Sequence, residues 1–189
     1  MITAFTAAAT TPYKALEILK KGAKKVFVEG VPPIGCLPMI LSRHLLPDHG
    51  DGDGDGCHSV INGNIKAHNS LLEEKLKELR RHFPDAIIFY VDVFAAHLSV
   101  VKEFKANGFE ESFKVCCGAG GGAPYNFNYS SMCGSPEASV ACSQPSKYIN
   151  WDGIHLTEAM NKRVAHLISH DGHCRPSFSG AFFNKSSVM

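Results

Sequence analysis

The sequence predicts an α/β fold built around a parallel sheet. Helical patterns alternate along the chain with short apolar runs, and those runs have the composition of buried strands. The clearest helical pattern covers residues 60–82, and a near-continuous apolar run over 86–94 follows it, as is typical of a strand covered on both faces. The order helix, strand, helix, strand, long loop and helix therefore favours parallel pairing.

The first two elements are a helix over residues 13–21 and a strand over 26–28. The helix has apolar residues at helical spacing and ends at Gly22, a residue type common just after helices. The strand is β-branched and aromatic, and it stops shortly before the Pro32-Pro33 pair. This pattern predicts a buried strand that leads into a rigid loop.

The later elements follow from the same signals. Helix 60–82 has one apolar stripe opposite its Glu, Lys and Arg residues, and Pro84 ends it. The remaining expected elements are a helix over 96–106, a long loop over 115–147, a final helix over 157–169 and an irregular tail over 170–189. Two parallel strands alone make a poor sheet. We therefore expect the N-terminal strands of the fold to be missing.

Charge and hydropathy exclude several classes of partner. The formal net charge of the 189 residues is +1, so neither nucleic acid nor an anionic membrane surface is a favoured partner. No apolar run approaches the roughly 18 residues needed to span a bilayer. The expected partner is a small molecule.

Cysteine usage indicates a secretory protein. The chain has seven cysteines, mostly in loop-like stretches, and Asn-x-Ser sequons at Asn128 and Asn184 are candidate N-glycosylation sites. The first residues lack the basic start and the apolar core of a signal peptide. Cysteines and sequons typical of a secreted protein, without a recognisable signal peptide, predict that the chain begins partway through a longer protein. An unusual leader is an alternative.

Two Asp-x-x-His patterns are candidates for an acid–base pair. Asp152-Gly-Ile-His155 follows the single tryptophan and precedes a helix, so Asp152 could fix the ring of His155 while the other ring nitrogen faces a cleft. A structural turn explains the residues equally well. Asp55-Gly-Cys-His58 lies in an acidic loop with no such context and serves as a control for chance matches.

Three other motifs imitate binding sites but are better explained as loops or tail. The run "GDGDGDG" (50–56) imitates a calcium loop, but Asn62 stands where a bidentate Glu is needed. "HDGHC" (170–174) has no second ligand cluster, and "CCGAGGG" (116–122) lacks the Lys-Ser/Thr of a phosphate loop. We expect no metal and no cofactor. No Gly-x-Ser-x-Gly and no Gly-Asp-Ser occurs in the sequence.

Taken together, several blocks closely resemble one known family. These are "VPPIGCLP" (31–38), "KVCCGAGGGAPYNFN" (114–128) and "MCGSPEASVACSQPSKYINWDGIHLTEAMN" (132–161). They are similar to the plant GDSL esterase/lipases, secreted members of the SGNH hydrolase superfamily, from about Leu16 to Ile168. The resemblance implies a three-layer α/β/α fold and a serine ester hydrolase.

The resemblance also implies which site residues the chain carries. Asp152 and His155 match the orienting acid and the general base of the family's final block. The family's Gly-Asp-Ser nucleophile and its glycine and asparagine oxyanion donors lie upstream of the matched region, so we expect no nucleophile and no oxyanion residue in this chain. Residues 1–169 would then be the C-terminal part of a single hydrolase domain.

The expected function is that of a secreted carboxylic-ester hydrolase acting on a small-molecule or lipid ester. The alternative is a truncated, catalytically inactive product that binds a partner or has no function. We expect the isolated chain to show no esterase activity on a short aryl ester, because the nucleophile and oxyanion donors are absent.

Cysteine positions predict a disulfide pattern. Cys36 follows the Pro-Pro turn and Cys57 ends the acidic loop, so a bridge between them would close that insertion. The adjacent Cys116 and Cys117 should not bond to each other, and one or both should reach Cys133 or Cys142. Cys174 is expected to be free or in a mobile tail.

Overall fold

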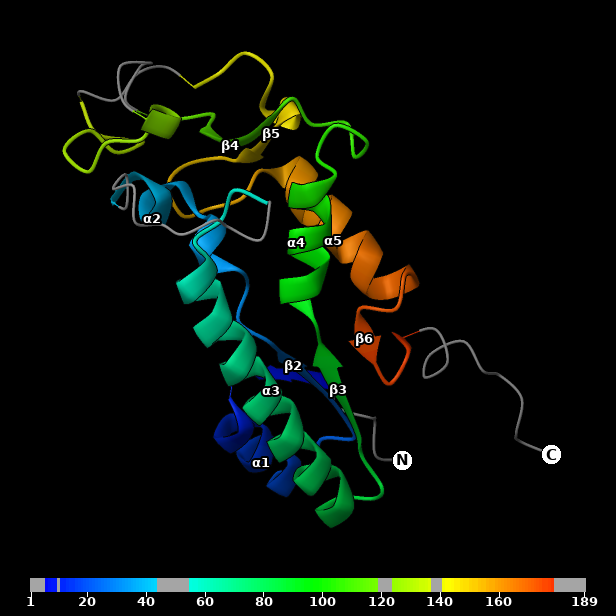
Figure 1. Cartoon of the computed structure of the whole chain (residues 1–189). Helices are drawn as coiled ribbons and strands as arrows, with labels where there is room; N and C mark the ends of the chain where they lie inside the picture. The colour runs from blue at the N-terminus through cyan, green and yellow to red at the C-terminus, as the bar shows by residue number, and fades with distance from the viewer. Residues whose placement is uncertain (1–5, 10, 44–54, 119–123, 137–140, 179–189) are drawn as a thin grey trace. The chain divides into compact units, whose positions relative to one another are not determined.

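The computed structural model describes residues 6–9, 11–43, 55–118, 124–136 and 141–178 (Figure 1). The chain divides into two compact units. Unit 1 comprises residues 1–32, 66–96 and 166–189, and unit 2 comprises residues 33–65 and 97–165. The prediction that residues 1–169 belong to a single hydrolase domain stays a prediction.

Unit 1 is built on a four-stranded sheet with the order β1-β2-β3-β6. Its strands are β1 (Thr6–Ala9), β2 (Lys25–Glu29), β3 (Ile87–Val91) and β6 (Cys174–Arg175). The strands β1, β2 and β3 are parallel, as predicted, whereas β6 pairs with β3 in the antiparallel direction. Sequence patterns indicated only β2 and β3, because β1 and β6 are too short to show periodicity.

One face of this sheet is covered by α1 (Pro12–Lys20) and α3 (Ser59–His82), which lie side by side in Figure 1. The side chains between these helices and the sheet form a core of Ala15, Leu19, Ala23, Val26, Val28, Leu72, Leu76, Ile88 and Tyr90. Successive strand residues point to opposite faces, so Val26 and Val28 enter this core while Phe27 does not. The apolar stripe of α3 thus has the role that its spacing predicts.

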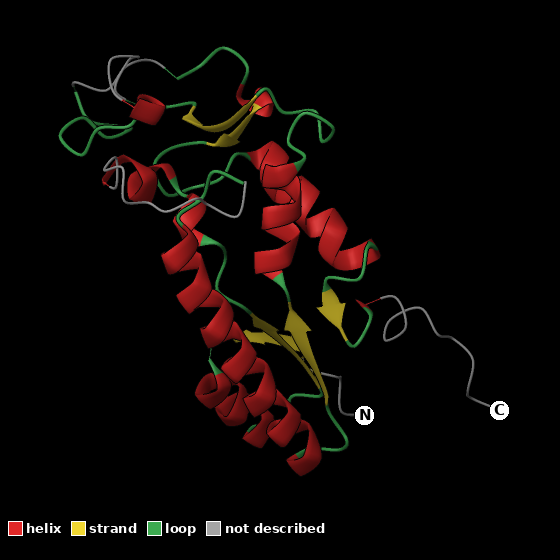
Figure 2. Cartoon of the chain, viewed as in Figure 1, coloured by secondary structure: helices red, strands yellow, loops and turns green. Residues whose placement is uncertain are grey.

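The other face packs against the end of α5 (Glu158–His170) and the segment that follows it. Phe27 stacks on Phe89 with ring centroids 4.4 Å apart, and Ile168 and Phe178 pack against this cluster. Within unit 1, helices therefore cover one face of the mainly parallel sheet, and the last turn of α5 with the segment after it covers the other; Figure 2 shows the strands in yellow and the helices in red. The fold class predicted from the sequence is confirmed.

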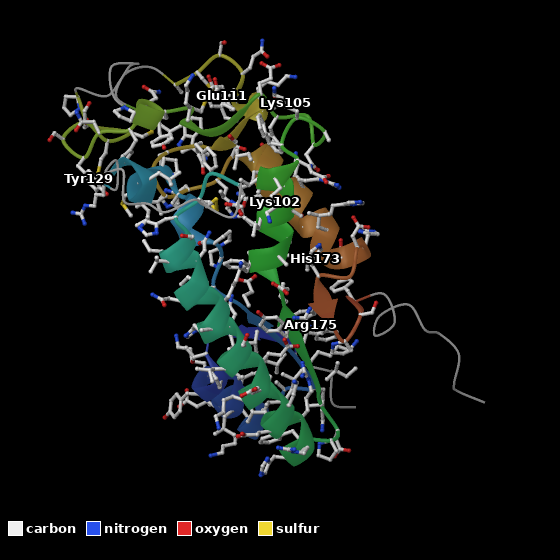
Figure 3. All side chains as sticks on the ribbon, viewed as in Figure 1. Lys102, Lys105, Glu111, Tyr129, His173 and Arg175 are labelled. Carbon is white, nitrogen blue, oxygen red and sulfur yellow. A yellow bond between two sulfur atoms is a disulfide. The ribbon has the colours of Figure 1, made fainter. Side chains whose placement is uncertain are left out.

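The segment after α5 is more ordered than expected. Cys174 is free and buried within β6, rather than in a mobile tail. Arg175, which Figure 3 labels, donates to both carboxylate oxygens of Glu73, at 2.8 and 3.0 Å, and to Asp92 at 3.2 Å. These charge-assisted bonds tie β6 to α3 and to the end of β3, where a sequence rich in His, Asp and Gly predicted only an irregular tail.

One helix begins a few residues earlier than predicted, for a physical reason. Helix α4 (Val93–Lys102) begins three residues before the predicted 96–106, because Asp92 accepts a hydrogen bond from Ala95 N at 3.0 Å and caps it. The apolar residues 93–94, which the sequence pattern places in the preceding strand, form the start of this helix. None of the helices in the described parts of the chain has the length and apolar character needed to cross a bilayer.

Unit 2 has its own two-stranded parallel sheet of β4 (Glu111–Val115) and β5 (Tyr148–Asn150). It also contains the short helix α2 (Pro38–Arg43). The described residues between β4 and β5 are mostly irregular, as predicted, apart from short 3₁₀ turns at Pro124–Asn126 and Pro145–Lys147. The two strands were not predicted, because β4 (ESFKV) contains no apolar run and β5 has only three residues, so both are defined by their pairing.

Three disulfides close the loops of unit 2. Cys36 bonds to Cys57, Cys116 to Cys142, and Cys117 to Cys133. The predicted Cys36–Cys57 bridge is confirmed, as is the prediction that Cys116 and Cys117 reach the later cysteines rather than each other.

Candidate active site

The strongest candidate site lies in the turn between β5 and α5, in unit 2. An isolated antiparallel bridge between Asn150 and Leu156 closes this turn, and Trp151 N donates to His155 O at 2.8 Å. Thr157 caps the following helix through Met160 N at 3.2 Å. The turn is therefore anchored at both ends by regular structure, which favours a fixed geometry for the side chains between them.

Within the turn, both oxygens of the Asp152 carboxylate accept hydrogen bonds. Oδ1 accepts from the backbone amides of Ile154, at 2.8 Å, and His155, at 2.7 Å. Oδ2 lies 2.8 Å from His155 Nδ1. The prediction that these two side chains lie within hydrogen-bonding reach is confirmed, and a carboxylate partner means that Nδ1 carries the proton.

The surroundings of Asp152 favour its ionised form. Partial burial raises the pKa of the carboxyl, but the hydrogen bonds from the His155 amide, the His155 ring and the Ile154 amide lower it by more, so the pKa lies below its usual value. The group is an anion at neutral pH, and it can hold the imidazole in one tautomer and stabilise an imidazolium.

The His155 ring faces outward, with 73% of its side chain exposed. Its turn follows the C-terminal end of β5, beside the end of β4, where Cys116 N donates to Asn150 O at 3.0 Å. Parallel sheets commonly place their reactive groups at this edge. With Nδ1 directed at Asp152, Nε2 is the nitrogen that remains to exchange a proton with a substrate or nucleophile.

Among the described residues, the only side chain that hydrogen-bonds to the His155 ring is that of Asp152. Neither a serine nor a cysteine hydrogen-bonds to the His155 ring there. The geometry is that of a carboxylate paired with an exposed imidazole, which is the arrangement that proton transfer to or from a hydroxyl nucleophile requires.

Residues outside the motif support the turn and were not predicted. Cys117 N donates to Trp151 O at 2.7 Å, and Met39 N donates to Gly153 O at 3.1 Å. A β-carbon added to Gly153 would overlap the ring of Phe127, which is 4% exposed. The sequence suggested that Gly153 permits a tight turn, but its φ lies outside the left-handed region and the structure requires it for space. The aromatic residues within 125–129 were the one feature of the sequence that could have indicated this supporting contact.

The control motif is arranged differently. Asp55 Oδ1 accepts from Cys57 N at 3.1 Å, and Oδ2 lies 3.7 Å from Lys102 Nζ. His58 Nδ1 is 3.5 Å from Ile61 N, a long contact at the start of α3. The acid of this turn thus bonds to an amide and faces a lysine, while its histidine ring faces a helix amide.

The remaining candidates form no site in the described part of the chain. No group of three or more His, Cys, Asp and Glu side chains gathers there to hold a metal ion. Residues 50–54 of the calcium-like run and 119–122 of the Gly-rich run lie outside the described residues, as does the sequon at Asn184. Asn128 is exposed, and its Oδ1 accepts from Ser130 N at 2.9 Å.

Comparison with known proteins adds a family likeness to this geometry. The family model described as GDSL-like Lipase/Acylhydrolase matches residues 3–168. A GDSL esterase/lipase of Arabidopsis thaliana is 42% identical over 172 residues, which are 91% of this chain and 44% of that protein. Acetylajmalan esterase 2 of Rauvolfia serpentina is 38% identical over 155 residues, 82% of this chain and 41% of that protein. The chain thus spans less than half the length of these relatives.

Proposed function

Because this chain belongs to the GDSL lipase/acylhydrolase family, we propose that it carries the acid–base pair of a carboxylic-ester hydrolase. His155 is the general base, and Asp152 is its orienting acid. Residues 1–169 form the C-terminal part of the hydrolase domain. The nucleophilic serine and the oxyanion donors belong to blocks of the family that the 189 residues do not include.

One observation carries this proposal. The Asp152 carboxylate is fixed by two backbone amides on one oxygen and faces His155 Nδ1 at 2.8 Å with the other. A turn that needed only local stability would be served by the two amide bonds. The third bond selects one tautomer of an exposed imidazole, which is what a general base requires.

The mechanism we propose is that of a serine esterase. A serine hydroxyl attacks the ester carbonyl and gives its proton to His155 Nε2, so that the charge on the imidazolium is balanced by Asp152. His155 then returns the proton to the leaving alcohol, and the acyl-serine forms. Water repeats the sequence to release the acid. Asp152 stays ionised throughout, as its lowered pKa favours.

The substrate is an ester of a small molecule or a lipid, and the protein is secreted. Three disulfides support an oxidising compartment, and the exposed Asn128 is a candidate N-glycosylation site. Digestion of the natively produced protein with a peptide N-glycosidase should lower its mass. An Asn128→Gln protein with the same mass shift would rule out Asn128 as the glycan site.

The decisive test begins with the transcript. Sequencing upstream of Met1 should reveal an in-frame Gly-Asp-Ser block, and the protein translated from it should hydrolyse a short-chain aryl ester. A complete transcript without that block would contradict the hydrolase proposal and favour the inactive, truncated product. Esterase activity of the 189-residue chain that disappears on His155→Ala would instead mean that another side chain has become the nucleophile.

A further inference from the structure

The turn that carries Asp152 and His155, here called the acid–base turn, is supported by a closed ring of contacts within unit 2. The ring of Phe127 lies against Gly153, and Gly153 O accepts from Met39 N at 3.1 Å. The Tyr129 hydroxyl donates to Met39 O, and the Tyr129 ring meets Phe127 edge to face with centroids 5.0 Å apart. Figure 3 labels Tyr129 on the segment that carries it. Each member of this ring of contacts thus restrains the next.

The segment that supplies the aromatic members is itself anchored. Phe127 and Tyr129 lie between Cys117 and Cys133, which form a disulfide, and Cys117 N donates to Trp151 O at 2.7 Å. Asn126 Nδ2 donates to Val115 O, at the end of β4, at 3.1 Å. The aromatic pair is therefore held against the same strand ends that carry the acid–base turn.

The position of the contact within the turn gives it a consequence beyond packing. Gly153 lies between Asp152 and the two amides, Ile154 N and His155 N, that fix the Asp152 carboxylate. A shift of the Gly153 peptide would move those amides relative to Oδ1. Hydrogen bonds weaken steeply as their geometry departs from linear, so the bond from His155 Nδ1 to Oδ2 would weaken with them.

We propose that Phe127 is a positioning residue of the acid–base pair, holding Asp152 and His155 in hydrogen-bonding register by supporting Gly153. The catalytic meaning of this role rests on the proposed function. Phe127 acts through the backbone of the turn, at Gly153, rather than through a polar group of its own.

The test measures the tautomer of His155 rather than activity. In the 189-residue chain with ¹⁵N-labelled histidine, at alkaline pH, Phe127→Ala should lower the ratio of Nδ1–H to Nε2–H on His155 by about tenfold, as the loss of one charge-assisted hydrogen bond implies. Phe127→Leu keeps part of the support and should restore much of the ratio.

The chain offers a matched control. Phe113 lies against Gly56 in the other Asp-Gly-x-His turn, 2.9 Å from where a β-carbon on that glycine would stand. Phe113→Ala removes a similar aromatic contact and should leave the His155 ratio unchanged. A folded Phe127→Ala protein with the wild-type ratio, or an equal change in Phe113→Ala, would overturn the proposal.

A second variant guards against loss of the fold. If circular dichroism shows that Phe127→Ala is unfolded, Phe127→Leu and Tyr129→Phe decide the matter, since the latter removes only the bond to Met39 O. Both should lower the ratio, and wild-type ratios in both would refute the role. The tautomer ratio is measured without turnover, so the two proposals can fail separately. If the Phe127 variants lower the ratio in the 189-residue chain but the complete protein has no esterase activity, only the proposed function is refuted.

Discussion

The two Asp-Gly-x-His turns share a sequence pattern and differ in what their acids bind. In the first, Asp152 accepts from His155 Nδ1 at 2.8 Å and from two amides. In the second, the carboxylate of Asp55 is buried, accepts from Cys57 N at 3.1 Å and lies 3.7 Å from Lys102 Nζ. Spacing alone therefore does not make an acid–base pair.

The turns also differ in how each is held. A phenylalanine ring lies against the glycine in both, Phe127 at Gly153 and Phe113 at Gly56. Gly56 has a φ of +75°, which favours glycine, and its neighbour Cys57 is bridged to Cys36. The 152–155 turn contains no cysteine and is held by hydrogen bonds between a strand and a helix. The second turn is consistent with a structural role, and the first leaves its histidine ring exposed.

Replacing the histidines of the two turns should give the largest difference in activity. In the protein translated from the complete transcript, His155→Ala should lower kcat for a short-chain aryl ester by about 10⁶-fold, the scale seen when a general base is removed from a serine hydrolase. His58→Ala should leave kcat unchanged. Steady-state kinetics of the two variants decide the matter, and equal losses would mean that the comparison of the turns is wrong.

Replacing the acids should give the next largest difference. Asp152→Asn keeps the shape but removes the charge that fixes the Nδ1–H tautomer, and kcat should fall by about 10⁴-fold. Asp55→Asn retains an acceptor for Cys57 N and should not change kcat. If Asp152→Asn keeps wild-type kcat, the carboxylate does not orient the base.

Removing the Cys36–Cys57 bridge should act on stability and on the second turn alone. The bonded residues are 21 positions apart, so Cys36→Ser/Cys57→Ser should lower the free energy of unfolding by about 3 kcal/mol in the chain-entropy model. Urea denaturation of the 189-residue chain measures this. Cys174→Ser, at the free thiol, is the control that leaves the bridges intact. A displaced His155 resonance in the double variant would show that the two turns are coupled.

The smallest effect concerns pH. The pKa of Asp152 is lower in the folded chain than its ordinary value of about 3.9, so its ionised form stabilises the fold above that pH, and this stabilisation is lost as pH falls through the lowered folded pKa. The difference in unfolding free energy between wild type and Asp152→Asn should be constant from about pH 5 to 7 and shrink below about pH 4. A difference that does not change with pH would contradict the hydrogen bonds described for Asp152.

Much of the framework could be predicted because long elements carry their own pattern. The stripe of α3 and the apolar run of β3 were recognisable, and so was the Cys36–Cys57 bridge, because these two cysteines flank one acidic loop; which of Cys133 and Cys142 pairs with Cys116 and which with Cys117 was left open. The strands β4, β5 and β6 were not recognisable. The sequence of β4, ESFKV, contains no apolar run, and β5 and β6 have only three and two residues, so all three become strands only through their partners.

The candidate site could be predicted only in part for a similar reason. The residue types and spacing of Asp152 and His155 indicated a pair, but the control motif shows the same spacing with another outcome. Gly153 illustrates the limit most clearly. Its sequence neighbours suggest a turn, whereas its need for space comes from Phe127, which is distant in sequence. Such contacts become visible only once the chain is folded.

A single spectrum of the wild-type chain tests the central claim most directly. Long-range ¹H–¹⁵N correlation of ¹⁵N-histidine protein at alkaline pH reports which ring nitrogen carries the proton, with His155→Gln and His58→Gln identifying the signals. Asp152 should hold His155 as the Nδ1–H tautomer, while His58, whose Nδ1 faces Ile61 N, should be the Nε2–H tautomer. A His155 signal of the Nε2–H form, or one that matches His58, would contradict the account.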